Sequence, residues 1–322
     1  MTSHICDTQG KWYQIMSELE GVPYNALDFM PYEWECEHES KESKNLKHQY
    51  LKDQMLDIIE WMEKITGKKY DDEKFINALN CECESASLWA HCCMVNRSIP
   101  AVMDEKMMHS LYVTAVLMRH EKASVDFYKE LLDELKDRAD RGIAAIENER
   151  LRLLLDGLPP WHSLEIYRYI EEFGGVSIGS HFSFGVSGGW AYDSEQDTRV
   201  PAKTPKEAGI KLNTREEACS WYAKWLLETN TVLRSLKFSG KGKNKHILDL
   251  VKKWNVDGVL IHLNRGCEGT ASGQMKIRYF LAENDIPVIT FEGNHADIRE
   301  FDLPRVKATI NTFMETLDLK KL

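Results

Sequence analysis

The sequence predicts an α/β protein in which two parallel-sheet lobes, of the Rossmann or flavodoxin kind, are joined by a helical layer. After residue 150, short apolar runs alternate with helical patterns, which is typical of a parallel sheet covered on both faces. From about residue 45 to 149 the pattern is helical almost throughout. We therefore expect an incomplete first lobe at 1–44, the helical layer at 45–149 and the second lobe at 150–322.

The first segment contains part of a strand–helix–strand unit. Cys6 precedes an amphipathic helical pattern that Gly21 ends, and residues 22–29 predict a short strand. An α/β lobe needs more strands than this, so we expect the natural lobe to extend upstream of residue 1.

The helical layer contains several long helices. One apolar repeat runs from Leu51 to Ile65 at helical spacing and ends at Thr66-Gly67. Either Asp71 or Asp72 is expected to cap the next helix, and a further helix is predicted over residues 124–140.

The last segment alternates strands with helices. The four predicted strands cover residues 151–155, 176–179, 259–263 and 288–291. The predicted helices cover residues 164–173, 216–236, 245–254, 274–283 and 304–317. The glycine-, serine- and aromatic-rich stretch 181–192 is expected to be a loop.

Composition excludes several functional classes. The chain has 322 residues, is 43% hydrophobic and carries a formal net charge of −10. This charge argues against binding to nucleic acid or to an anionic lipid surface. No apolar run is long enough for a membrane span and the start lacks the pattern of a signal peptide, so we expect a cytoplasmic protein with no membrane partner.

Two motifs favour ordinary structural roles. Residues 240–243, Gly-Lys-Gly-Lys, lack both the spacing of a phosphate-binding loop and a preceding strand, so a solvated loop is expected. The pairs Cys81/Cys83 and Cys92/Cys93 lie in a helical pattern, where neighbouring side chains diverge in direction. We expect these cysteines to pack on helices rather than to bind zinc, which usually uses C-x-x-C pairs.

Cys6 and Cys267 share a more informative setting. Each follows an apparent strand and opens a helix, where the helix dipole and free N–H groups stabilise a thiolate. Either cysteine alone is compatible with a structural role. Together, in two separate α/β units, they indicate a cofactor shared between lobes. Two thiolates are nevertheless fewer than the roughly four that an iron–sulfur cluster usually takes.

Several residues near Cys267 suit cofactor binding. Arg265 can form charge-assisted hydrogen bonds to a cluster or to an acyl-CoA anion. Gly266 and Gly269 would let the backbone approach a bulky group, and Glu292 ends the next strand on the same rim. For His295, a structural or solvated role is favoured over proton transfer. His262, within a strand, is expected to pack.

At these residues the chain resembles the family of 2-hydroxyacyl-CoA dehydratases and benzoyl-CoA reductases. The resemblance rests on ICDTQGKWYQ followed by VPYNALDF, on LKDQMLDIIEWMEKITGKKY, on LLDGLPPW and on the segment from DGVLIHLNRGCEG to HADIREFD. It extends over nearly the whole chain. In this family two α/β lobes hold a 4Fe–4S cluster, and the matching ligands here are Cys6 and Cys267. The resemblance implies that a third family cysteine would lie upstream of residue 1.

The resemblance implies an iron–sulfur subunit of an (R)-2-hydroxyacyl-CoA dehydratase. A homologous second subunit and a separate ATP-hydrolysing iron–sulfur activator are the implied partners, and an acyl-CoA is the implied substrate. One electron would form a ketyl radical anion on the thioester, which would expel the 2-hydroxyl group. Removal of the β-proton, which this makes more acidic, would then give an enoyl-CoA. A benzoyl-CoA reductase subunit, a non-catalytic electron-relay subunit and an inactive remnant remain alternatives.

Overall fold

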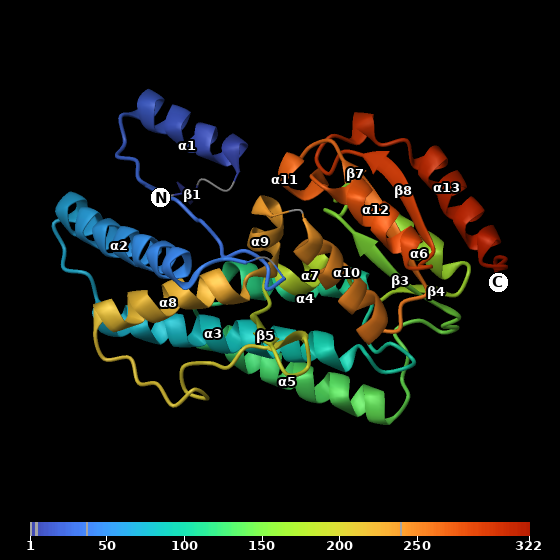
Figure 1. Cartoon of the computed structure of the whole chain (residues 1–322), viewed down its shortest axis with the longest axis horizontal. Helices are drawn as coiled ribbons and strands as arrows, with labels where there is room; N and C mark the ends of the chain where they lie inside the picture. The colour runs from blue at the N-terminus through green and yellow to red at the C-terminus, as the bar shows by residue number, and fades with distance from the viewer. Residues whose placement is uncertain (1, 4–5, 37, 239) are drawn as a thin grey trace.

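The computed structural model describes residues 2–3, 6–36, 38–238 and 240–322, and the largest sheet among them is four-stranded and parallel (Figure 1). The strands are β3 (Leu151–Asp156), β4 (Gly175–Ser177), β7 (Gly258–Asn264) and β8 (Val288–Gly293). Their order is β4-β3-β7-β8, so the chain passes from β4 over β3 to reach β7. The predicted α/β fold and all four predicted strands of the second lobe are confirmed.

Helices cover both faces of this sheet. Along β3, Leu153 and Leu155 pack with helices α6 (Glu165–Glu171) and α13 (Leu303–Thr316). Leu154, between them in sequence, belongs to the cluster on the other face with α10 (Lys241–Lys253) and α12 (Gln274–Glu283). Successive strand residues point to opposite faces, and both faces are apolar here, which explains the continuous apolar runs in the sequence.

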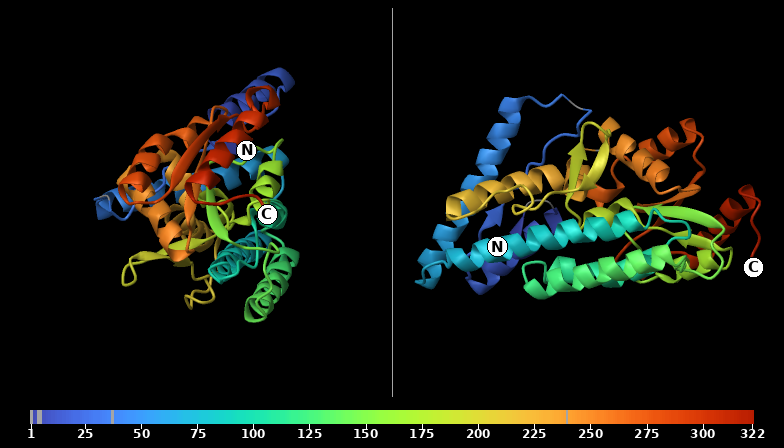
Figure 2. Two further views of the ribbon diagram at one scale, coloured as in Figure 1. Left: turned by 90° about the vertical axis from the view of Figure 1, so that its right-hand side faces the viewer. Right: turned by 90° about the horizontal axis from the view of Figure 1, so that it is seen from below.

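Four long helices make up most of residues 41–140. They are α2 (Lys41–Thr66), α3 (Asp72–Val95), α4 (Glu105–Leu117) and α5 (Lys122–Asp140). Gly67 ends α2 in the left-handed conformation, and Asp71 caps α3 by accepting a hydrogen bond from Lys74 N at 3.0 Å, as predicted. Helix α8 (Arg215–Thr229), from later in the chain, lies along α2 and contacts α3 (Figure 2).

The start of the chain is a small strand–helix–strand unit. Strands β1 (Thr2–Ser3) and β2 (Ala26–Leu27) pair in parallel, and α1 (Asp7–Glu20) connects them. The predicted helix and following strand are therefore confirmed. Much of the apolar surface of α1 is exposed, including Trp12 and Leu19.

Two predictions for the middle of the second lobe were wrong. The expected loop at 181–192 contains α7 (His181–Gly185) and the strand β5 (Trp190–Asp193), which pairs antiparallel with β6 (Thr198–Pro201). A capping box at Ser180 starts α7. The single helix expected at 216–236 is two helices, α8 and α9 (Thr231–Lys237), because Asn230 caps the second through a 2.9 Å bond from Leu233 N.

The glycine- and lysine-rich stretch 240–243 is not the solvated loop that we expected. It begins α10, and a Cβ added at Gly242 would lie 1.9 Å from Cβ of Trp34. Lys243 is only 3% exposed. The glycine therefore lets the first turn of α10 pack closely against a tryptophan from the first segment, a contact that composition alone does not reveal.

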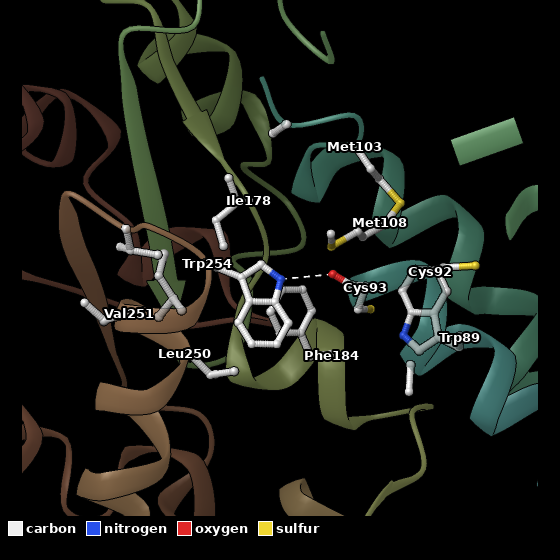
Figure 3. Packing of buried hydrophobic residues seen from close by; sticks show 14 of the residues in the cluster. Trp89, Cys92, Cys93, Met103, Met108, Ile178, Phe184, Leu250, Val251 and Trp254 are labelled. Atoms are coloured by element: carbon white, nitrogen blue, oxygen red, sulfur yellow. Dashed lines mark hydrogen bonds between the residues drawn. The ribbon is translucent and has the colours of Figure 1, made fainter. Parts of the chain in front are cut away.

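The helix-borne cysteines pack in the core as predicted. Cys92 and Cys93 are fully buried among apolar side chains, and Trp254 Nε1 donates a hydrogen bond to the carbonyl of Cys93 at 2.9 Å (Figure 3). Cys83 is also buried, and Cys81 is partly exposed. Within the described residues, no helix is both long and apolar enough to cross a membrane.

Candidate functional site

Both cysteines that the sequence singled out stand at helix starts. Cys267 is the N-cap of the short helix α11 (Glu268–Ala271), three residues after β7 ends, and is a partly exposed free thiol. Cys6 is the exposed N-cap of α1. Neither cap side chain makes a hydrogen bond to its helix. Each thiol therefore lies at a helix start that follows a strand, as predicted.

The described residues do not complete a metal site. No three histidine, cysteine, aspartate or glutamate side chains among them are placed to hold a metal ion. An iron–sulfur cluster usually takes about four cysteine ligands. Cys6 and Cys267 are only two thiols, so their role as cluster ligands stays a prediction.

Asn264 fixes the segment that leads to Cys267. It is the last residue of β7 and is 2% exposed. Its Oδ1 accepts hydrogen bonds from Gly266 N at 2.9 Å and from His295 N at 3.1 Å. The loops that follow β7 and β8 are thus held together by one side chain. The sequence signal for this role was a polar residue at the end of an apolar strand.

Arg265 and Glu292 lie beside one another on the exposed rim. Their side chains form an ion pair, and Arg265 N donates to Gly293 O at 2.9 Å. Both residues border an open cleft of about 380 Å³ between β8 and the start of α13. This cleft also contains Arg299 and Arg305. The role predicted for the pair in cofactor binding stays a prediction.

The two glycines near Cys267 allow close contacts within the protein. A Cβ at Gly266 would lie 2.7 Å from Nδ1 of His295, and a Cβ at Gly269 would lie 3.0 Å from Leu236. Both glycines therefore pack against other parts of this chain, and their contact with a cofactor stays a prediction.

The two histidines of this region have structural contacts. His262 is 2% exposed, its Nδ1 lies 2.6 Å from Leu158 O and its ring stacks on Phe291, which confirms that it packs. Nδ1 of His295 lies 3.0 Å from the side-chain nitrogen of Asn264. Burial lowers the pKa of both imidazoles, which favours their neutral forms at pH 7.

A small polar cavity that the sequence did not predict lies at the carboxyl end of β3 and is bordered by α11, the helix that follows β7. Its volume is about 20 Å³. Five buried polar residues from five elements border it: Asp156, His181, Ser235, Lys243 and Gln274. Burial raises the pKa of Asp156, and burial lowers the pKa of Lys243; attraction between the two opposes both shifts. The position of Asp156 at the end of a predicted strand was the one feature of the sequence that could have indicated this cavity.

The cavity and Cys267 are connected through α11. Thr270 borders the cavity, and its Oγ1 donates to the carbonyl of Cys267 at 3.2 Å. The strand order changes direction between β3 and β7, and the carboxyl edge at such a switch point is where open α/β sheets bind ligands. The fold is thus an open α/β fold with a polar cavity and a thiol at the sheet edge where proteins of this class bind ligands.

Comparison with known proteins defines the class further. Residues 1–317 match the family described as 2-hydroxyglutaryl-CoA dehydratase, D-component, and the chain belongs to this family. It is 26% identical over 322 residues to the (R)-phenyllactyl-CoA dehydratase alpha subunit of Clostridium sporogenes, covering 99% of this chain and 70% of that protein.

Two further relatives show the breadth of the family. The alpha subunit of (R)-2-hydroxyglutaryl-CoA dehydratase from Acidaminococcus fermentans is 23% identical, over 98% of this chain and 59% of that protein. A benzoyl-CoA reductase subunit of Thauera aromatica is 21% identical, over 98% of this chain and 69% of that protein. The chain thus spans about three fifths to seven tenths of these relatives.

Proposed function

We propose that this chain is the iron–sulfur subunit of an (R)-2-hydroxyacyl-CoA dehydratase, a lyase that removes water to give an enoyl-CoA. The observation that carries the proposal is Cys267, a thiol at the start of α11 on the carboxyl edge of the sheet, one helical turn from a buried polar cavity. Family membership supports it. Relatives named for phenyllactyl, 2-hydroxyisocaproyl and lactoyl thioesters differ in the acyl side chain but share the 2-hydroxyl group.

Cys6 and Cys267 are the proposed protein ligands of a 4Fe–4S cluster, and Arg265, Gly266, Gly269 and Glu292 would flank it. When bound, the cluster would supply one electron to the substrate thioester. The substrate would then lose its 2-hydroxyl as hydroxide and a β-proton, and would release the electron again, so that water is removed without net reduction. The chain would bury the reacting group and orient it. The sequence lacks phosphate-loop and dinucleotide motifs, which is consistent with ATP hydrolysis by a separate activator.

The proposed partners are a homologous second subunit and this activator. Because acyl-CoA esters and ATP are cytoplasmic compounds, we place the complex in the cytoplasm.

A benzoyl-CoA reductase subunit is the second candidate, favoured by the similarity to the Thauera aromatica protein. The third candidate function is that of a subunit that only relays electrons. In that case a substrate thioester would change the cluster spectrum of the partner but not of this chain.

The test is an anaerobic assay of the chain produced together with its partner subunit. The complex receives the activator, ATP, a one-electron reductant and either a set of (R)-2-hydroxyacyl-CoA esters or benzoyl-CoA. The proposal predicts ATP-dependent formation of the enoyl-CoA, detected by mass spectrometry. Ring reduction of benzoyl-CoA without any dehydration would favour the second candidate. The Cys81→Ala variant, altered on α3 away from the sheet edge, serves as the control and should keep full activity.

A further inference from the structure

The cavity bordered by Asp156, His181, Ser235, Lys243 and Gln274 has an unusual excess of unpaired polar atoms. Within the described part of the chain, six side-chain atoms of the residues that border it have no hydrogen-bond partner. They are Oδ2 of Asp156, both ring nitrogens of His181, Oγ of Ser235 and both amide atoms of Gln274. All four residues are at most 6% exposed. Buried polar groups are normally paired, so this wall has the character of a binding site.

The types of these groups restrict what the cavity can bind. The Asp156 carboxylate only accepts hydrogen bonds when ionised, while the Lys243 ammonium only donates and makes a long, 3.5 Å hydrogen bond to Ser272 O. Gln274 and Ser235 can do both. An anion in the cavity would be repelled by the Asp156 carboxylate, and a cation would be repelled by the Lys243 ammonium. A neutral group that both donates and accepts hydrogen bonds therefore fits the cavity best. A hydroxyl group has this property.

The size of the cavity agrees with a single hydroxyl. A volume of about 20 Å³ is enough for one oxygen-sized group and too small for a longer side chain. Phe182, Val232 and Leu236 form an apolar part of the wall, suited to the carbon that bears the hydroxyl. Thr270 connects this wall to Cys267, and residues three apart on a helix lie about 5–6 Å from each other.

We propose that this cavity binds the 2-hydroxyl group of the substrate thioester and thereby distinguishes 2-hydroxyacyl-CoA from acyl-CoA. The inference rests on the proposed function, which supplies the thioester. A site that pairs a substrate hydroxyl rejects the analogue lacking it, because the buried polar groups then stay unpaired. Gln274, which presents both a donor and an acceptor, is the residue on which this selectivity chiefly depends.

Binding measurements without turnover test the inference. The complex of this chain and its partner subunit is titrated calorimetrically with (R)-lactoyl-CoA and with propionyl-CoA, which differ by one hydroxyl, in the absence of activator. The wild type is expected to bind lactoyl-CoA at least about tenfold more tightly. Gln274→Leu should bring the ratio of the two Kd values close to one while leaving the Kd for propionyl-CoA unchanged.

Two further variants show whether a change in the ratio of the Kd values comes from the cavity. Gln49→Leu makes the same change on the exposed side of α2 and should keep the wild-type ratio. Ser235→Ala removes a single hydroxyl and should reduce the ratio about threefold, so the inference remains testable if Gln274→Leu does not fold. Equal binding of both thioesters to the wild type would overturn the inference and leave the proposed function intact. Binding of neither thioester would overturn both.

Discussion

The side chain of Asn264 holds the backbone of His295: Oδ1 of Asn264 accepts the His295 N–H at 3.1 Å, and the same oxygen accepts Gly266 N–H at 2.9 Å. The two loops at the carboxyl ends of β7 and β8 therefore share one acceptor. Because Cys267 directly follows Gly266, its position depends on this side chain.

Removal of this link should loosen the segment around Cys267. Asn264→Ala leaves two backbone N–H groups without their acceptor, and we expect a loss of about 2 kcal/mol in the free energy of unfolding. The thiol of Cys267 should also react faster with a disulfide reagent, measured in a background in which Cys6, Cys36 and Cys81 are replaced by serine. Asn284→Ala, at the exposed end of α12, is the control and should change neither quantity appreciably. An unchanged reaction rate in Asn264→Ala would contradict the positioning role.

Gly242→Ala should destabilise the protein strongly. The added methyl group would overlap Trp34, so either α10 or the first segment must shift, at a cost of about 3 kcal/mol. Gly10→Ala is the matched control, since it lies inside α1 with open space around its Cα, and should stabilise the helix by up to about 1 kcal/mol. Chemical denaturation measures both changes. Equal effects at the two positions would show that Gly242 does not make this contact.

Gln274→Leu should raise the stability of the unliganded protein while abolishing hydroxyl selectivity. Leucine has a similar size and removes two buried polar atoms that lack partners, so a gain of about 1 kcal/mol is expected. Binding sites often carry such a cost in stability. Thermal unfolding without ligand measures the gain. A loss of more than about 1 kcal/mol would indicate that Gln274 already has its partners within the protein.

Glu105 should make the stability dependent on pH. It is fully buried, its carboxylate accepts a 2.7 Å hydrogen bond from Ser177, and burial raises its pKa to about 7. Between the unfolded pKa of 4.5 and about 7, the folded protein binds the proton more tightly, so this group's contribution to stability falls as the pH rises through that window.

The Glu105→Gln variant isolates this effect. Its free energy of unfolding relative to the wild type should increase by about 3 kcal/mol from pH 4.5 to pH 8, since each pKa unit corresponds to about 1.4 kcal/mol. The difference between the two proteins cancels the opposite contribution of buried histidines such as His109, whose pKa is lowered to about 4 by burial. A difference that does not vary with pH would contradict the raised pKa.

The sequence was sufficient for the elements that depend on local pattern and insufficient for those that depend on packing. Apolar runs located the strands, and the positions of Cys6 and Cys267 at helix starts followed from strand–helix alternation. Lys243 was misassigned because glycine and lysine are typical of loops, whereas Trp34, about 200 residues earlier, lets that stretch pack as a helix.

The polar cavity could not be predicted for a related reason. Asp156, His181, Lys243 and Gln274 come from four elements that are widely separated in sequence. Each residue taken alone has an ordinary structural explanation. Only the packing of α7, α10 and α12 against the end of β3 brings their side chains to one point.

The central claim is that Cys267 ligates an iron–sulfur cluster in a dehydratase complex, and iron analysis of the anaerobically purified complex with its partner subunit tests it most directly. Relative to the wild-type complex, Cys267→Ser should lack about four iron atoms and a similar amount of acid-labile sulfide, while Cys81→Ala keeps both. Iron and sulfide contents in a folded Cys267→Ser complex equal to those of the wild type would contradict the account.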